Sequence, residues 1–229
     1  MKNQKPETPK LRFTPSAWAK LLYLRDYGDT EVGGFGICPN HPLLVEEIKL
    51  VKQNCTQTFV SFDDESVADF FEDQVADGLT PEQFARVWIH THPGASAEPS
   101  LTDEETFERV FGKSNWAVMA ILACGGESYA RIRFKSGLEQ GLLLKTEVDF
   151  TYPFSASQFE EWESEYFDNV VAEEPFIGDP WDWTSDDLLN PSGLNPESIY
   201  NHDFYLEDDY LNEQFERFDA EQFDAATNH

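Results

Sequence analysis

Two histidines separated by one residue, His90 and His92, form the strongest chemical pattern in the sequence. Residues at this spacing on a β-strand point to the same face, with Cα atoms roughly 6.5 to 7 Å apart, so both imidazoles can reach one metal ion. Asp103 follows a loop rich in Pro and Gly, and its carboxylate could return toward the end of the strand. Two nitrogens and one carboxylate oxygen leave the fourth tetrahedral position open for water, which is typical of catalytic zinc.

A hydrolytic zinc site also needs a group that takes a proton from water and gives one to the departing amine. Glu31 is the candidate, because it begins a glycine-rich segment that would permit close approach of backbone or substrate. Glu46 and Glu47 also precede the histidines, and the glycines favour Glu31 over them. The hydroxyl of Ser100 could hydrogen-bond the oxyanion that forms when water attacks a carbonyl.

Together these residues resemble the JAMM motif of the JAB/MPN metalloproteases. Glu31 is followed by His90-Thr91-His92-Pro93, then six residues, Ser100, two residues and Asp103. The resemblance covers residues 11–150 and implies zinc ligation by His90, His92 and Asp103, with Glu31 as general acid and base. It implies that Ser100 supports the transition state. It also implies a deubiquitinase-like activity, hydrolysis of isopeptide or peptide bonds at the C-terminus of ubiquitin-like proteins.

Each of these residues also has an ordinary structural interpretation. Ser100 or Thr102 could cap a helix, Asp103 could be a favourable charge in its first turn, and the glycines could form a β-bulge. The complete set at this spacing favours a metal site, although iron or manganese would tolerate the same ligands. No HExxH or GxxxxGK[ST] pattern is present, and three further histidines have no partners at ligand spacing: His41, His202 and His229.

Hydrophobic periodicity predicts a mixed α/β fold, and the resemblance implies an MPN/JAMM fold, a mostly antiparallel β-sheet flanked by helices. Helical spacing predicts helices starting at Pro15 and spanning residues 65–76 and 102–111. Three short strand-like segments, at residues 31–38, 43–51 and 58–62, suggest an antiparallel meander. Further strands are expected at residues 86–92, 116–124 and 129–134.

Charge divides the chain near Phe154. Residues 155–229 hold 21 acidic residues and one basic residue, Arg217, which gives a net charge of −20 out of −28 for the whole chain. The sequence therefore predicts an N-terminal extension at residues 1–10, a catalytic domain at 11–153 and an acidic tail at 154–229. Aromatic residues at helical spacing at 159–170 and 204–218 predict two short amphipathic helices in the tail, and a stretch rich in Pro, Gly and Asn between them contains Trp181-Asp182-Trp183.

Composition limits the classes of partner and location. No run of about 18 apolar residues and no signal-like N-terminus exists, so a cytoplasmic protein with no membrane partner is expected. The net charge of −28 and the lack of Lys/Arg clusters argue against nucleic acid. The three cysteines, Cys38, Cys55 and Cys124, form no CxxC pair and are interpreted as reduced thiols.

Three functions follow as hypotheses. The first is a zinc (Zn2+) isopeptidase or peptidase that deconjugates or matures a ubiquitin-like protein. The alternatives are a non-catalytic MPN scaffold acting through its acidic tail, and a hydrolase of a sulfur-carrier adduct. The aromatic tail would dock a conjugating or activating enzyme, pack back on the catalytic domain, or be disordered and solubilising.

Overall fold

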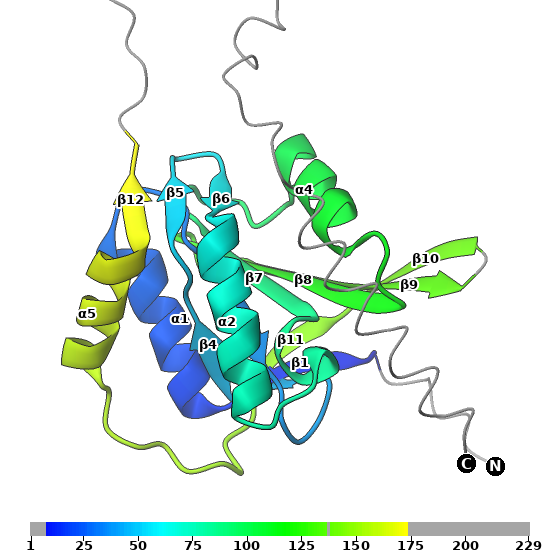
Figure 1. Ribbon diagram of the computed structural model, residues 1–229, viewed down its shortest axis with the longest axis horizontal. Coiled ribbons are helices and arrows are strands. Elements are labelled where there is room, and N and C mark those ends of the chain that lie inside the picture. Colours follow the sequence, from blue (N-terminus) through cyan, green and yellow to red (C-terminus); the bar gives the residue numbers. More distant parts are fainter. Residues whose placement is uncertain (1–7, 137, 174–229) are drawn as a thin grey trace, which may run out of the picture.

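The computed structural model describes residues 8–136 and 138–173 as a mixed α/β fold (Figure 1). A six-stranded sheet forms its centre, in the order β10-β9-β8-β7-β2-β4, and two three-stranded sheets lie beside it. Neighbouring strands of the central sheet are antiparallel except β7 and β8, which are parallel. Its strands are β2 (Gly33–Ile37), β4 (Glu47–Lys49), β7 (Val87–His92), β8 (Trp116–Ala123), β9 (Ser128–Ser136) and β10 (Leu138–Leu143).

The two small sheets collect short strands from distant parts of the chain. In one, β1 (Lys10–Phe13) lies between β11 (Lys145–Val148) and β3 (Leu44–Val45) and is parallel to both. In the other, β5 (Gln53–Cys55) lies between β12 (Val170–Ala172), parallel to it, and β6 (Val60–Phe62), antiparallel to it.

The meander expected across residues 31–62 is confirmed only in part, because β2 pairs antiparallel with β4, whereas β6 pairs with β5 in another sheet. The segments divide among all three sheets: β3 pairs with β1 and β6 with β5, while β4, which is separated from β3 by Glu46 alone, pairs with β2. The strands are only two to five residues long. Such short segments carry too little alternation to indicate their partners.

Helices cover both faces of the central sheet, which separates two hydrophobic clusters. On one side, α1 (Pro15–Tyr27) begins at the Thr14 cap, whose hydroxyl accepts from the Ala17 amide, and packs Leu21 and Leu24 with β7 and β8 residues. On the other side lie α2 (Asp64–Ala76), the short α3 (Pro81–Phe84) and α4 (Leu101–Phe111). Because both of its faces are covered, β7 is buried at every residue.

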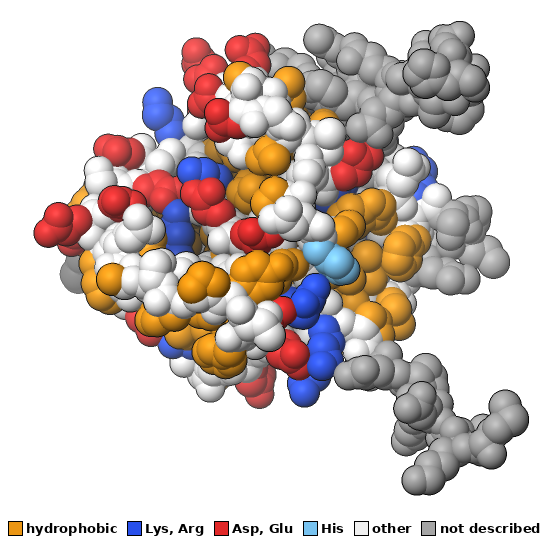
Figure 2. All heavy atoms as spheres, turned by 90° about the horizontal axis from the view of Figure 1, so that it is seen from below, with side chains coloured by type: hydrophobic (Ala, Val, Ile, Leu, Met, Phe, Trp, Pro, Cys, Tyr) orange, Lys and Arg blue, Asp and Glu red, His pale blue; other side chains and the backbone are white. Residues whose placement is uncertain are grey.

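Part of the predicted tail packs on the domain. Helix α5 (Phe159–Asn169) lies against α1 and buries Trp162 and Tyr166, while β12 extends the β5–β6 sheet. The segments at 181–183 and 204–218 lie outside the described residues. In the described part, no helix has the length and apolarity needed to cross a membrane. Acidic side chains are scattered over the face shown in Figure 2, among basic and hydrophobic ones.

Candidate metal centre

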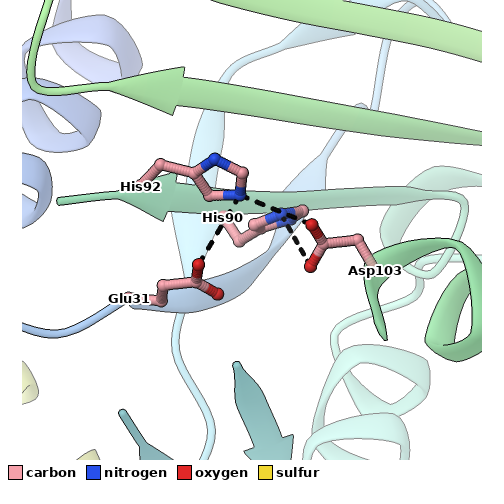
Figure 3. A group of neighbouring side chains, drawn as sticks. All are labelled: Glu31, His90, His92 and Asp103. Carbon is pink, nitrogen blue, oxygen red and sulfur yellow. Dashed lines mark ion pairs between the residues drawn. The ribbon is translucent and has the colours of Figure 1, made fainter. Parts of the chain in front are cut away.

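His90 and His92 occupy the last half of β7 and direct both rings to the same side of the sheet (Figure 3). The ring centroids lie 5.1 Å apart. His90 is fully buried and His92 is 9 % exposed, so one ring lies inside the protein and the other lies at the edge of the site. The strand therefore places two imidazoles at a common point, as their spacing predicts.

Asp103 approaches the histidines from α4. It lies in the first turn of the helix, whose N-cap is Ser100, and the residue is only 3 % exposed. Asp103 Oδ1 is 3.4 Å from His90 Nε2, and Asp103 Oδ2 is 3.5 Å from His92 Nε2. The loop between β7 and α4 thus returns this carboxylate to the end of the strand.

Glu31 enters from the segment that precedes β2. Its carboxylate is buried, with Oε1 3.6 Å from His92 Nε2, and β2 pairs Gly33 with His90 on the neighbouring strand. Glu46 and Glu47, the other candidates for this role, instead pair with Asn40 and Lys49. At Gly33 the missing side chain makes room for Val60 rather than for a substrate, since a Cβ there would lie 2.8 Å from Val60 Cγ1.

The four side chains together have the dimensions of a metal site. One ligand atom from each of Glu31, His90, His92 and Asp103 lies within 4.8 Å of all the others. Three of the pairs, His90–Asp103, His92–Asp103 and His92–Glu31, are 3.4 to 3.6 Å apart, which is longer than a hydrogen bond and close to the roughly 3.4 Å edge of a tetrahedron with bonds of about 2.1 Å. Both His90 ring nitrogens, His92 Nε2 and Glu31 Oε2 are buried without a hydrogen-bond partner among the described residues. Burial of polar and charged groups costs free energy unless a partner compensates them, and a divalent cation bound between these four side chains would be such a partner.

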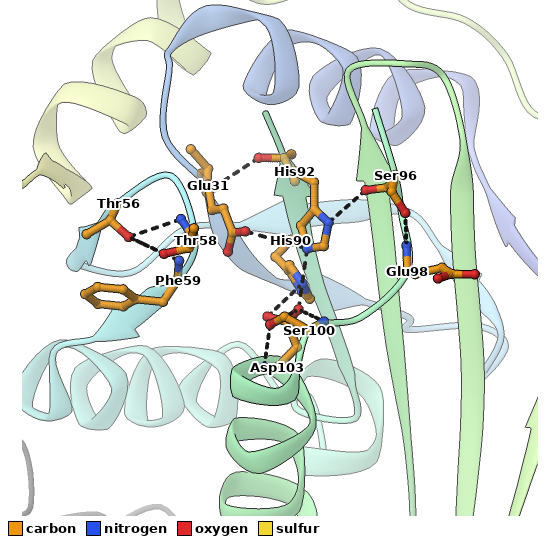
Figure 4. A network of polar contacts seen from close by, with 12 residues as sticks. Glu31, Thr56, Thr58, Phe59, His90, His92, Ser96, Glu98, Ser100 and Asp103 are labelled. Atoms are coloured by element: carbon orange, nitrogen blue, oxygen red, sulfur yellow. Dashed lines mark hydrogen bonds and ion pairs between the residues drawn. The ribbon is translucent and has the colours of Figure 1, made fainter. Parts of the chain in front are cut away.

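A backbone contact selects the tautomer of His92. Its Nδ1 is 3.0 Å from the Ser96 carbonyl oxygen, which can only accept, so Nδ1 carries the proton and donates it (Figure 4). In the neutral imidazole, Nε2 is then unprotonated and faces the cluster with its lone pair. This is the outer hydrogen bond that commonly orients a metal-ligating histidine.

Burial and mutual interaction shift the ionisation of the cluster. Burial is the main cause that raises the pKa of Glu31 to about 8. The nearby charge of Asp103 also raises this pKa, and His92 partly opposes the increase. Desolvation of Asp103 is outweighed by its contacts with His90, His92 and Ser100, so its pKa lies well below the usual range. Burial lowers the pKa of His90, whereas for His92 the contacts with Asp103 and Ser96 outweigh burial and raise the pKa. The metal-free cluster therefore holds one ionised and one readily protonated carboxyl group.

Ser100 lies beside the cluster but is not one of its four members. Its Oγ accepts from the Asp103 amide at 3.1 Å and donates to Asp103 Oδ2 at 2.8 Å. The hydroxyl thus caps α4, and its single hydrogen atom is directed at Asp103. In this arrangement, Ser100 orients the Asp103 carboxylate, and contact with an oxyanion would require the hydroxyl to rotate.

Several residues around the cluster were not predicted as site residues. Trp88 stacks on His90 with ring centroids 4.3 Å apart, and it also stacks on Phe107 of α4. Trp88, His90 and His92 alternate along β7, so the strand periodicity could have placed Trp88 on the site face. The contact between Ser96 and His92 depends on the loop conformation and has no comparable signal in the sequence.

No protein-family model matches the chain, and none of the curated proteins matches it either.

Proposed function

We propose that the protein is a zinc-dependent hydrolase of the JAB/MPN type that cleaves peptide or isopeptide bonds at the C-terminus of a ubiquitin-like protein. The observation that carries the proposal is the convergence of Glu31, His90, His92 and Asp103 within 4.8 Å of one another in a buried setting. The order and spacing of these residues with Ser100 match the JAMM motif throughout. A mixed α/β fold with helices on both faces of a largely antiparallel central sheet agrees with that resemblance.

The residues divide into ligands and a proton-transfer group. His90, His92 and Asp103 would hold the zinc ion, a donor set of two nitrogens and one oxygen that leaves a coordination position free. When bound, the ion supplies Lewis acidity, which polarises a carbonyl group and lowers the pKa of water.

Glu31 performs the proton transfers in this proposal. Its Oε2 has no hydrogen-bond partner among the described residues and is available to accept a proton from the attacking water. The same carboxyl group then donates a proton to the departing amine. Burial favours the protonated form of Glu31, and a neighbouring cation favours the ionised form, so the two influences poise the group for both steps.

The experiment uses a panel of ubiquitin-like proteins that carry C-terminal extensions, incubated with the zinc-loaded full chain. Wild type and Glu31→Gln are compared, each with and without a chelator, and bound zinc is quantified. Glu47→Gln is the matched control, because Glu47 is an exposed glutamate that pairs with Lys49 on the surface.

The proposal would be supported if wild type and Glu47→Gln cleave a substrate and the chelator abolishes this cleavage. Glu31→Gln should not cleave, although it still binds zinc. Retained turnover in Glu31→Gln would remove Glu31 from the mechanism. Bound zinc without cleavage of any panel member would instead favour the scaffold function or a sulfur-carrier adduct as substrate.

A further inference from the structure

The backbone that carries Glu31 is held by three successive amide hydrogen bonds to other parts of the chain. The Glu31 amide donates to the Thr56 carbonyl oxygen at 2.7 Å. The Val32 amide donates to Thr91 Oγ1 at 3.0 Å, and the Gly33 amide donates to Gln53 Oε1 at 2.8 Å. Two of these three acceptors are side chains, so the path of residues 31–33 depends on particular amino acids as well as on strand pairing.

Thr91 connects this segment directly to the metal-binding strand. It lies between His90 and His92 on β7 and is 1 % exposed. Its hydroxyl accepts from the Val32 amide, and its own amide donates to the Val32 carbonyl at 3.0 Å. This reciprocal pair fixes the distance between the Glu31 segment and the strand that carries both histidines.

Gln53 makes a second reciprocal pair on the other side of the segment. Its Oε1 accepts from the Gly33 amide, and its Nε2 donates to the Gly33 carbonyl at 3.0 Å and to the Val51 carbonyl at 2.9 Å. Gln53 is 2 % exposed and is the first residue of β5. The turn after β5 supplies the Thr56 carbonyl that accepts from the Glu31 amide. That turn is ordered by Thr56 Oγ1, which accepts from the Thr58 and Phe59 amides (Figure 4).

The Glu31 carboxylate itself has little to hold it in place. Its Oε2 makes no hydrogen bond within the described residues, and its Oε1 is 3.6 Å from His92 Nε2. The backbone therefore determines where the carboxylate lies. We propose that Thr91 and Gln53 are positioning residues that place the Glu31 carboxylate beside the metal ligands through the Val32 and Gly33 amides. The catalytic consequence rests on the proposed function, whereas the positioning is measurable without it.

Variants that remove one acceptor at a time test this proposal. Thr91→Val keeps the shape and β-propensity of the side chain but removes the hydroxyl, and Thr91→Ser keeps the hydroxyl. Gln53→Met removes the amide while keeping an unbranched side chain of similar length. Thr14→Val is the matched control, because Thr14 is also a buried threonine whose hydroxyl accepts a backbone amide, that of Ala17, at the start of α1.

The first measurement is amide hydrogen exchange by NMR in the metal-free full chain. Loss of one hydrogen bond should accelerate exchange of the Val32 amide in Thr91→Val, and of the Gly33 amide in Gln53→Met, by about 5- to 10-fold relative to wild type. Thr91→Ser and Thr14→Val should leave both amides at the wild-type rate. Crystal structures of the zinc-loaded variants should show the Glu31 carboxylate displaced in Thr91→Val and Gln53→Met but not in the other two.

The second measurement is hydrolysis of the substrate found with the panel above. Thr91→Val and Gln53→Met should lower kcat roughly 10- to 100-fold, with KM and zinc affinity close to wild type, and Thr91→Ser should restore kcat. Unchanged exchange together with an unmoved Glu31 carboxylate would overturn the positioning role, as would full kcat in Thr91→Val. An inactive wild type would refute the proposed function but not the positioning role. Amide exchange and the position of the Glu31 carboxylate would still decide the role of Thr91 and Gln53.

Discussion

Asp103 Oδ2 accepts two hydrogen bonds from Ser100, one from the backbone amide at 2.7 Å and one from the hydroxyl at 2.8 Å. The Asp103 amide returns a hydrogen bond to Ser100 Oγ, which completes a capping box at the start of α4. The same carboxylate faces His90 and His92. One pair of residues therefore both caps the helix and orients the carboxylate that faces the histidines.

Ser100→Ala should weaken both functions. Loss of the cap should lower the free energy of unfolding of the metal-free chain by about 1 kcal/mol, and loss of the contact with Asp103 should lower zinc affinity about 10- to 100-fold. Asp63→Ala is the control, because Asp63 caps α2 through the Ser66 amide and does not contact the cluster. Urea denaturation and zinc competition titration measure the two effects, and equal zinc affinity in both variants would show that Ser100 acts as a cap alone.

Zinc should stabilise the folded chain only while His92 is present. Ligand that binds the native state alone raises the free energy of unfolding by about 2.7 kcal/mol at 100 times Kd. Thermal unfolding with and without zinc should show this increase in wild type and lose it in His92→Ala. His41→Ala should behave as wild type, since His41 is exposed and its Nδ1 contacts only the Leu43 amide among the hydrogen bonds described. A zinc-dependent increase in His92→Ala would place the ion elsewhere.

The raised pKa of Glu31 predicts a pH-dependent difference between wild type and Glu31→Gln in the metal-free state. Burial raises this pKa from 4.5 to about 8, so between these values the folded chain binds a proton that the unfolded chain releases. Stability therefore falls as pH rises through this window, because the unfolded state binds fewer protons. Glu31→Gln removes this penalty and should become more stable relative to wild type, by about 1 to 4 kcal/mol from about pH 5 to about pH 8.

Urea denaturation of both metal-free proteins across that range provides the measurement. Saturating zinc should reduce or reverse the advantage of Glu31→Gln, because a neighbouring cation favours the ionised carboxylate. A difference in the free energy of unfolding that does not change with pH would contradict the raised pKa.

The parts of the site that depend on local spacing could be predicted from the sequence. His90 and His92 share a face because alternate residues of any strand do, and Asp103 lies in the first turn of a helix that Ser100 caps. Glu31 was placed by its neighbouring glycines, and the structure brings it into the cluster. The relation of His90, His92 and Asp103 needs only strand and helix geometry and one loop reversal, whereas Glu31 comes from a distant segment and was chosen by the motif and its neighbouring glycines.

The remaining features depend on contacts between distant segments. Gln53 meets Gly33 across 20 positions, and nothing in the residues around Gln53 indicates that pairing. Likewise, β1 and β12 are strands of four and three residues whose partners lie far along the chain. The spacing of Phe159, Trp162 and Tyr166 predicts a helix, yet whether that helix packs on the domain depends on the tyrosines that α1 presents to it.

The packing of α5 on α1 makes its buried aromatic residues part of the folded unit. Trp162 is 6 % exposed and lies 5.7 Å from the Tyr23 ring, measured between centroids, whereas Phe167 on the same helix is 68 % exposed. Trp162→Ala should therefore lower the free energy of unfolding by about 3 kcal/mol or more, while Phe167→Ala, which removes a largely exposed ring that contacts Tyr27, should lower it by about 1 kcal/mol or less. Urea denaturation of the full chain with each substitution distinguishes the two. Equal, small effects would mean that α5 contributes nothing to stability and that the folded unit ends before it, as the charge boundary near Phe154 suggests.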